Sequence, residues 1–430
     1  MLRTAHILYI TARYPALSET FVWREIQEVR SRGHTVTVIR LRPPTTDADN
    51  CVAPATPGGG VVDGYGLGPL ALISDVFKAF AHRPLRCLYA LAMSLSMAGL
   101  QPDLRNRERL LQPLQALLAI ALFSRMPAPL PTHIHAHMAN TPTTIAMYLA
   151  AVMNTTFSFT GHANDLFVHR VMLPAKLRRC GFAASITSWH QRWYSHLSGR
   201  DNACFPIVRC GVDIPPPSRP ADRRRPFTVC FVGRLVPKKG VDTLVAAIDI
   251  LRSQGADCIC HIIGDGPQMD ALRHQIRSLA LEDRVELHGA KDHQSALQCI
   301  AASDAFALPC RTDRHGDREG LPVALMEAMA AGKPVVCSPF PGLEDLVIHE
   351  RTGLLVPSDS PKLLADAIKR FASDAALASR LGAAAKEAVS SEFSTDINID
   401  RLLNAFGLAP APRPLQVISR IARRPVESVS

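Results

Sequence analysis

The sequence predicts an α/β protein made of two doubly wound domains that face each other across a cleft. Apolar strands and amphipathic helices alternate along most of the 430 residues, as in parallel sheets covered by helices. A proline- and arginine-rich stretch at 215–226 interrupts this alternation and is typical of a linker. The composition, 47% hydrophobic and 20% charged, suits two domains with substantial cores.

The first series of elements begins with an apolar strand at 5–10. A helix is expected at 18–32, opened by Ser18 and closed by Gly33. Valines and threonines then alternate in a strand at 34–40. The remaining expectations are a loop at 43–69, a helical excursion near 70–126, and short strands at 134, 157–159, 183–188 and 206–210.

The second series follows the linker and repeats the alternation more regularly. Strands are expected near 227–232, 258–263, 284–288, 304–309, 334–338 and 353–356. Helices fit the gaps at 240–254, 268–280, 293–301, 322–331, 342–348 and 360–373. Strand ends in such sheets carry the ligand-binding loops, so the functional residues are expected there.

The formal charge of +10 lies wholly in the first half, because residues 1–212 carry 21 Lys/Arg and 11 Asp/Glu. This asymmetry indicates an anionic partner, although a diffuse basic surface would explain it equally well. Nucleic acid is disfavoured, since no recognition motif occurs and aromatics make up 6%. Basic residues of the 76–125 segment favour an anionic membrane surface.

The sequence favours a cytoplasmic protein, peripheral on the inner face of the cytoplasmic membrane. The longest apolar stretches, 87–100 and 110–123, are shorter than the ~20 residues that span a bilayer. The segment 1–10 is too short for a signal peptide. Cysteines lie in apolar runs, and Cys258 and Cys260 are expected to pack in a core as reduced thiols.

Two carboxylates separated by seven residues, Glu319 and Glu327, are the most informative feature of the chain. Between them Pro322 suits the first position of a helix. The amides of Gly320 and Leu321, with the helix dipole, would bind an anion. Carboxylates that hold hydroxyls around a phosphate site predict a nucleotide-sugar ligand. Two solvated glutamates on an alanine-rich helix are the alternative.

The loop after the first strand of the second series carries cations beside glycine. Gly233, Arg234 and Lys239 would suit a diphosphate, because guanidinium binds phosphate bidentately and ammonium acts as a point charge. A solvated basic turn is the alternative interpretation of this loop.

The loops after the next two strands are rich in glycine. Gly264, Asp265 and Gly266 would let the backbone approach a ligand closely, or form only a tight turn. His288 and Gly289 would accommodate a flat base. The spacing lacks the third glycine of the dinucleotide fingerprint.

Together these motifs resemble the donor-binding half of family-4 retaining glycosyltransferases, which have the GT-B architecture. In the first half, segments 14–21, 133–137 and 158–165 resemble the branch that builds bacterial exopolysaccharides, including colanic-acid-type enzymes. The resemblance covers roughly residues 5–395. The first strand-to-helix loop, 12–18, departs from the family because it lacks paired glycines.

The resemblance implies four segments. These are an N-terminal acceptor-side domain at 1–213, a C-terminal donor domain at 214–392, a helix at 393–408 that crosses back to the first domain, and a basic tail at 409–430, for which disorder is one interpretation.

The resemblance also implies a reaction: transfer of a sugar from a UDP- or GDP-sugar to a hydroxyl of a saccharide or lipid-linked acceptor, with retention. No cofactor or metal is expected. Arg234 and Lys239 would neutralise the diphosphate, Glu327 would hold ribose, and Glu319 would hold hydroxyls of the transferred sugar. His162 would face the reacting carbon or a sugar hydroxyl. A polyprenyl-linked acceptor would lie at the anionic membrane surface. Acceptor-side candidates are Ser18, Glu19 and Asp165.

Two other functions fit the same residues. A sugar-nucleotide epimerase of this architecture would use the donor without an acceptor. A non-catalytic sugar-nucleotide-binding subunit would hold the donor without turnover.

Overall fold

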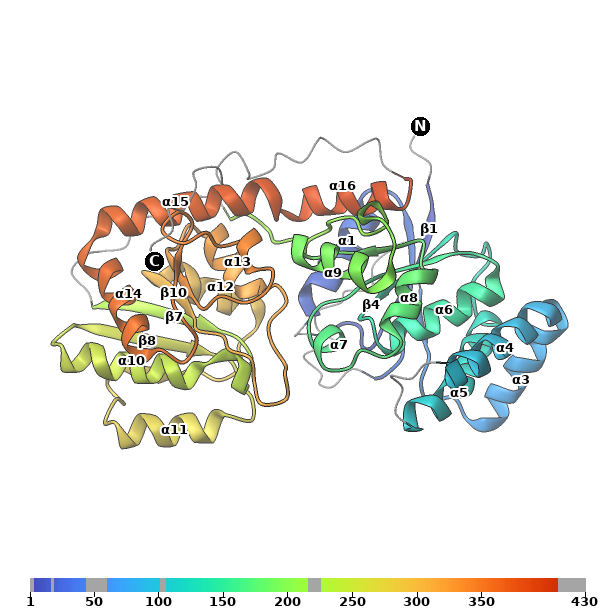
Figure 1. Cartoon of the computed structure of the whole chain (residues 1–430), viewed down its shortest axis with the longest axis horizontal. Coiled ribbons are helices and arrows are strands. Elements are labelled where there is room, and N and C mark those ends of the chain that lie inside the picture. Colours follow the sequence, from blue (N-terminus) through green and yellow to red (C-terminus); the bar gives the residue numbers. More distant parts are fainter. Residues whose placement is uncertain (1–3, 17–18, 44–59, 101–105, 216–225, 409–430) are drawn as a thin grey trace.

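The computed structural model describes residues 4–16, 19–43, 60–100, 106–215 and 226–408. It confirms the predicted fold class, because two six-stranded parallel sheets are each flanked by helices (Figure 1). Ser18, most of the predicted linker and the predicted basic tail lie outside the described residues.

Both sheets are parallel throughout. The N-terminal sheet runs in the order β3 (Val61–Asp63), β2 (Thr35–Arg40), β1 (His6–Thr11), β4 (His133–His137), β5 (Phe157–Thr160), β6 (Phe182–Ala184). The C-terminal sheet runs in the order β12 (Leu354–Leu355), β11 (Val335–Cys337), β10 (Ala305–Leu308), β7 (Phe227–Val232), β8 (Cys258–Ile263), β9 (Val285–Leu287).

The two sheets share one topology. In each, the first strand of the series pairs with the second on one side and with the fourth on the other. The strand order therefore reverses between β1 and β4 and between β7 and β10. Doubly wound sheets bind ligands at this reversal, beyond the carboxyl ends of the strands.

Helices of the N-terminal half cover both faces of its sheet and extend beyond it. They are α1 (Thr20–Ser31), α3 (Pro69–His82), α4 (Pro84–Leu100), α5 (Asn106–Phe123), α6 (Thr141–Met153), α7 (Asn164–Phe167), α8 (Leu173–Arg179), α9 (Ser188–Ser198) and the 3₁₀ turn η2 (Asn202–Cys204). The predicted excursion thus consists of α3, α4 and α5. No helix among the described residues is long and apolar enough to cross a membrane.

The C-terminal half contains α10 (Val241–Ser253), α11 (Met269–Ser278), α12 (His293–Ala302), α13 (Val323–Ala330), α14 (Pro361–Ser373), α15 (Ala375–Glu392) and the 3₁₀ turns η3 (Pro237–Lys239) and η4 (Leu343–Asp345). The last helix, α16 (Thr395–Ala405), packs on α1 of the N-terminal half. Arg32, the C-cap residue of α1, donates to Asp400 of α16 at 2.6 Å. Figure 1 shows α15 and α16 running along one side of both halves.

Some predicted elements differ from the structure. Segment 206–210 does not form a strand. Within it, only Ile207 forms a β-bridge, with Ser185, just after the end of β6. The expected helix 342–348 is only the turn η4. Strand β3 lies within the predicted loop, and α15 was not predicted although Asp374 caps an alanine-rich run by accepting from Leu377.

The packing role predicted for two cysteines is confirmed. Cys258 and Cys260 are free thiols on β8, 4% and 0% exposed. They pack in the core of the C-terminal half with residues such as Val229 and Phe231 of β7.

Candidate functional site

The reversal between β7 and β10 brings Glu319 against two lysines. The loop after β7 passes through η3 into α10, while the loop after β10 leads to α13. Lys239 Nζ lies 3.0 Å from Glu319 Oε2, and Lys238 Nζ lies 3.3 Å from Oε1. Glu319 is 8% exposed. A carboxylate and two ammonium groups are thus concentrated where the topology predicts ligand binding.

Glu319 and Lys239 form an ionised pair. Burial alone would raise the pKa of Glu319, but the charges and hydrogen bonds of Lys239 and Lys238 outweigh it and lower the pKa below its ordinary value. Burial would conversely lower the pKa of Lys239, and Glu319 raises it above its ordinary value. The protein therefore holds fixed charges of both signs in a largely water-excluded position, where they act strongly on a ligand.

The segment that follows Glu319 forms the N-terminal end of α13. Pro322 is the N-cap residue and not the first helical residue, which is Val323. Within the described residues, the backbone amides of Gly320 and Leu321 donate no hydrogen bond to a protein acceptor. Amides at a helix N-terminus that have no protein acceptor can bind an anion, so a phosphate site beside Glu319 stays a prediction that this geometry permits.

Glu327 lies on α13 and faces the N-terminal half. Its Oε1 accepts from Nη2 of Arg24 on α1 at 2.7 Å and lies 2.8 Å from His293 Nε2. Burial would raise the pKa of Glu327, but His293 and Arg24 lower it below its ordinary value. One carboxylate oxygen is therefore already occupied by an ion pair between the two halves.

Glycines hold the loops after β7, β8 and β9 together. Gly264 has φ +144°, and a Cβ there would lie 1.9 Å from the carbonyl oxygen of Gly233. Gly264 donates its amide to the carbonyl of Gly289 at 2.9 Å. Only glycine fits this contact, and the three predicted ligand loops form one continuous backbone surface.

Three further donor-side candidates line these loops. Arg234 is exposed, and Asp265 accepts the amide of Leu235 through its carbonyl at 2.9 Å and the amide of Gly266 through Oδ1 at 2.7 Å. His288 follows β9, with Nε2 at 3.1 Å from His261 Nδ1.

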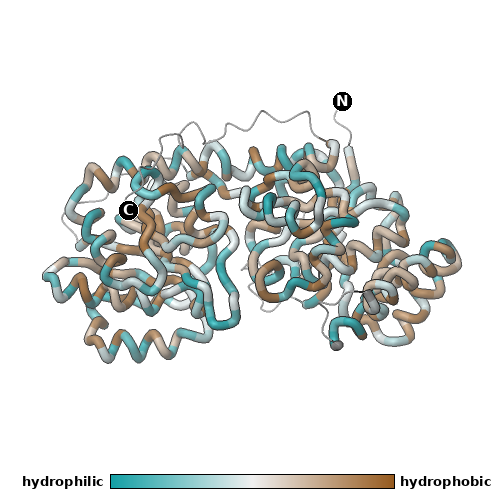
Figure 2. The backbone as a smooth tube through the Cα atoms, viewed as in Figure 1, coloured by the Kyte–Doolittle hydropathy of each residue, from teal (hydrophilic) through white to brown (hydrophobic). Residues whose placement is uncertain are grey.

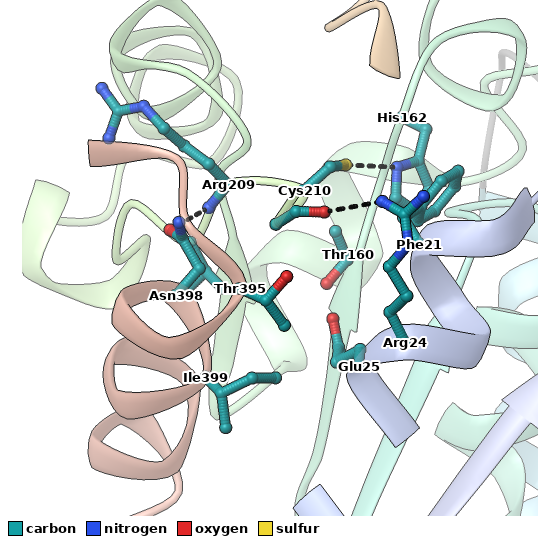
Figure 3. Close-up of a pocket in the computed structure, with 12 residues that line it drawn as sticks. Phe21, Arg24, Glu25, Thr160, His162, Arg209, Cys210, Thr395, Asn398 and Ile399 are labelled. Carbon is teal, nitrogen blue, oxygen red and sulfur yellow. Dashed lines mark hydrogen bonds between the residues drawn. The ribbon is translucent and has the colours of Figure 1, made fainter. Parts of the chain in front are cut away.

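His162 of the N-terminal half is buried and linked to protein groups through both ring nitrogens. Nε2 lies 3.2 Å from His137 Nδ1. Nδ1 lies 3.8 Å from Cys210 Sγ, a contact that Figure 3 marks with a dashed line. The ring packs on Phe21 of α1 with centroids 4.5 Å apart. Burial, followed by His137, lowers the pKa of His162 well below its ordinary value, so the imidazole is neutral.

A half-buried carboxylate, Glu25, lies at the other end of this histidine pair. Burial would raise the pKa of Glu25, but His137 chiefly lowers it below its ordinary value. Ionised Glu25 accepts from Tyr9 at 3.0 Å and from His137 Nε2 at 3.1 Å. His137 Nδ1 in turn lies 3.2 Å from His162 Nε2, so Glu25, His137 and His162 form one hydrogen-bonded chain.

Asp165 supports the loop that carries His162. Its carboxylate accepts the amides of Ala139 at 2.6 Å, Ala163 at 3.0 Å and His162 at 3.2 Å. Burial raises the pKa of Asp165 despite these hydrogen bonds. These contacts hold the backbone of His162 in place.

Glu19, another acceptor-side candidate, is a half-buried residue and is the N-cap of α1.

The two halves touch directly where Gly320 meets His162. A Cβ on Gly320 would lie 2.0 Å from the carbonyl oxygen of His162. Ser188 of α9 also donates its amide to Asp345 of η4 at 2.7 Å. The Glu319 cluster and the His162 loop are therefore adjacent, although 157 residues separate them in sequence.

A small cavity lies beside His162 between α1 and α16 (Figure 3). Phe21, Arg24 and Glu25 line it from α1, while Thr395 lines it from α16. Its volume of about 10 Å³ accommodates at most one water molecule. A cavity of this size admits no sugar.

Sequence reasoning missed several members of these clusters. Arg24, Glu25 and Cys210 carry no local motif, and Lys238 was passed over in favour of its neighbour Lys239. A signal existed for Lys238, which lies within the same glycine-bounded loop. None existed for Arg24, which contacts a residue 303 positions away.

Two groups in the described part of the chain could hold a metal ion. Glu25, His135 and His137 lie within the N-terminal half, and the second group consists of His261, Glu286 and His288 at the edge strand β9. Both sets combine imidazole with carboxylate, which suits zinc. His135 also bonds Ser158 and Thr160 at 2.8 and 3.0 Å, as in a buried packing role.

Part of this chain is similar to proteins whose names describe sugar transfer. Residues 218–388 match the family described as "Glycosyl transferases group 1". A GDP-mannose-dependent alpha-(1-6)-phosphatidylinositol monomannoside mannosyltransferase of Mycobacterium tuberculosis is 38% identical over 175 residues, 40% of this chain and 45% of the relative.

Relatives named for exopolysaccharide synthesis match the same share of the chain. A colanic acid biosynthesis protein of Escherichia coli is 38% identical over 170 residues, 38% of this chain and 41% of the relative. An amylovoran biosynthesis glycosyltransferase of Erwinia amylovora is 37% identical over 173 residues, 40% of this chain and 42% of the relative. The chain thus spans less than half of each relative.

Solved structures extend the likeness to the whole fold. Anabaena HepE, determined with UDP and glucose, has a TM-score of 0.68 at 17% identity and covers 94% of this chain and 99% of its own. A sucrose-phosphate synthase from Thermosynechococcus elongatus has a TM-score of 0.68 at 20% identity, with coverage of 94% and 98%. The predicted resemblance and the GT-B architecture are confirmed.

Proposed function

Since residues 218–388 belong to the glycosyl transferases group 1 family, we propose that the protein is a retaining glycosyltransferase. It would move a sugar from a UDP- or GDP-sugar to a hydroxyl of a saccharide or lipid-linked acceptor. The pathway would be the synthesis of a bacterial exopolysaccharide or cell-surface glycan, as the names of several relatives suggest.

One observation carries this proposal. The ionised Glu319–Lys239 pair lies beside the unpaired amides at the start of α13, and Gly320 touches the carbonyl of His162 in the other half. A carboxylate that can accept from hydroxyls, a phosphate site and the facing loop thus meet at the junction of the two sheets. A donor with a sugar on a diphosphate matches these groups in order.

The donor would contact the C-terminal half throughout. Lys239 and exposed Arg234 would neutralise the diphosphate and the charge that grows on it as it leaves. Glu319 would hold hydroxyls of the transferred sugar. The base would lie along His288 and Gly289, on the backbone surface built by Gly264.

Glu327 would hold the ribose hydroxyls. Because Arg24 and His293 already occupy its Oε1, a ribose must use the other oxygen or displace Arg24. Donor binding would then be coupled to the position of α1 and of the N-terminal half.

In the proposed reaction, the acceptor hydroxyl attacks the anomeric carbon on the face from which the diphosphate departs. The bond between the sugar and the phosphate oxygen breaks as the new glycosidic bond forms, and the leaving phosphate takes the acceptor proton. Neutral His162, supported by Asp165, would border the reacting carbon from the N-terminal half. No covalent protein nucleophile is required.

We further propose that the protein works in the cytoplasm, peripherally on the inner face of the cytoplasmic membrane. A lipid-linked acceptor would be presented there, and the +10 charge of the N-terminal half would favour anionic lipid. Nucleic acid is not a proposed partner.

A panel of UDP- and GDP-sugars tests the function. The true donor should raise the melting temperature and release nucleoside diphosphate slowly by hydrolysis, and faster with acceptor present. Formation of a new nucleotide-sugar without diphosphate release would instead identify an epimerase. A thermal shift without any turnover would identify a binding subunit.

We expect turnover to survive treatment with EDTA within about twofold of the untreated rate, because Lys239 and Arg234 supply the charge that a metal would otherwise provide. Measuring diphosphate release before and after dialysis against chelator checks this. If EDTA abolished activity and added divalent metal restored it, the prediction would be wrong. The two histidine-containing groups would then be the candidate metal sites.

Glu327→Ala should raise the donor KM about 10- to 100-fold while kcat stays within a few-fold, because ribose contacts are made equally in the ground and transition states. Steady-state kinetics at varied donor concentration check this. Glu387→Ala, at an exposed position of α15, is the matched control. A variant with the wild-type KM would remove Glu327 from the donor site.

A further inference from the structure

Helices α3, α4 and α5 form a protrusion at the end of the molecule farthest from the C-terminal sheet (Figure 1). Their inner faces pack on one another and on α6. Residues such as Ala79, Ala90 and Ala116 are fully buried there. The protrusion is therefore a folded part of the N-terminal half with a definite outer face.

The outer face of this protrusion is strongly apolar. Nine of the twelve large hydrophobic side chains that are exposed in the described residues lie on these three helices: Leu70, Ile73, Phe77, Leu85, Leu88, Tyr89, Leu95, Leu110 and Leu114. Exposure reaches 84% at Leu70, 72% at Phe77 and 79% at Leu85. Figure 2 shows these helices largely in the hydrophobic colour.

The spacing of these side chains indicates a surface and not scattered exposure. On α3 they recur at Leu70, Ile73 and Phe77, and on α4 at Leu85, Leu88 and Tyr89, intervals of three and four that follow one helix face. Scattered exposed hydrophobics are ordinary, but such a concentration marks an interaction site.

Several of the basic residues in this segment form ion pairs or hydrogen bonds with other residues of the protein. Lys78 and Arg125 both pair with Asp75, at 3.0 and 2.6 Å. Arg83 donates to the carbonyl of Met153 at 2.8 Å, at the end of α6. The solvent-exposed surface of the protrusion is therefore more apolar than the number of basic residues in its sequence suggests.

We propose that the protrusion α3–α5 inserts its apolar side chains into the interfacial layer of a lipid bilayer and so anchors the protein to it. Attraction between basic residues and anionic lipid would assist binding but would not dominate it. This inference rests on the proposed function and deepens it, because it defines how the enzyme meets a lipid-linked acceptor.

A bilayer fits this surface better than a second copy of the chain. Exposed Arg86 and Arg107 lie among the apolar residues, and the N-terminal half carries the whole formal charge of +10. If two copies of the chain packed through this face, the positive charges of both copies would lie close together and repel. Lipid offers acyl chains to the leucines and anionic headgroups to the arginines.

Vesicle flotation at two ionic strengths separates insertion from adsorption. Binding to vesicles of phosphatidylcholine with phosphatidylglycerol should fall less than about threefold between low salt and ~0.5 M salt, because apolar insertion is not screened. Weak but measurable binding to pure phosphatidylcholine should remain. Complete loss at high salt would show adsorption by charge alone and overturn the proposal.

Paired variants test the residues. Leu70→Ser with Phe77→Ser, and Leu85→Ser with Leu88→Ser, should each lower vesicle partitioning about 100-fold. Leu363→Ser removes a side chain that is 47% exposed on α14 of the C-terminal half and should bind as the wild type does. Wild-type partitioning by both double variants would contradict insertion.

Two controls keep the outcome independent of catalysis. The thermal shift with nucleotide-sugar should be the same in the double variants and the wild type, which shows that the chain is folded whether or not it transfers sugar. Analytical ultracentrifugation without lipid should show a monomer over a wide concentration range. A dimer that the serine variants abolish would assign this face to a second copy instead.

Discussion

Glu319→Gln is expected to lower kcat about 100- to 1,000-fold and to change the donor KM less than about fivefold. Glutamine preserves the shape of the side chain but loses its charge, so Lys239 and Lys238 lose the ionised partner that positions them at 3.0 and 3.3 Å. The sugar hydroxyls lose their carboxylate acceptor in the same step. Initial rates of diphosphate release at varied donor concentration measure both parameters.

Asp317→Asn is the matched control for Glu319→Gln. Asp317 Oδ1 lies 3.2 Å from Lys238, but its carboxylate is not proposed to contact the donor. This control should keep kcat within about fivefold of the wild type. Unchanged kinetics in Glu319→Gln, with an intact thermal transition, would rule out the pocket at the start of α13.

Gly320→Ala is expected to lower kcat/KM more than about 100-fold, although it adds a single methyl group. That methyl would lie 2.0 Å from the carbonyl oxygen of His162, and both groups belong to the backbone of packed elements. The halves must separate to relieve the contact, which moves Glu319 away from the His162 loop. The radius of gyration in solution scattering should rise together with the kinetic loss.

A second glycine serves as a control that tests whether the kinetic loss in Gly320→Ala arises from the contact between the two halves. Gly99 lies in α4, and a Cβ at this position would have nothing within 4 Å, so Gly99→Ala should be neutral or slightly stabilising. If Gly320→Ala kept wild-type kinetics and scattering, the contact between the halves would not be part of the active arrangement.

The donor half could be predicted closely because its information is local. Strands β7 and β8 occur at the predicted residues, and Glu319, Gly320 and Lys239 all lie on loops at strand ends. Alternating apolar residues and turn-forming glycines act within a few positions, so a sequence pattern identifies them. The misplaced helix at 342–348 lies in a stretch that forms only the turn η4.

The N-terminal half was harder because its site is assembled from distant segments. His162 was found through its motif, but its partners His137 and Cys210 come from 25 and 48 positions away. The sequence analysis interpreted segment 76–125 from its basic residues. Asp75, which pairs with two of those cations, lies just before that segment. No local pattern reports which cations will be paired.

The sequence by itself determined the alternation of strands and helices, the glycine-bounded donor loops and the seven-residue spacing of Glu319 and Glu327. Only the tertiary structure showed that Arg24 forms an ion pair with Glu327 and that the backbone of Gly320 contacts the carbonyl of His162. It also showed that leucines of three helices lie on one outer surface. Periodicity and turn chemistry are short-range properties of the chain. Contacts between elements depend on the packing of two whole sheets, which no single segment encodes.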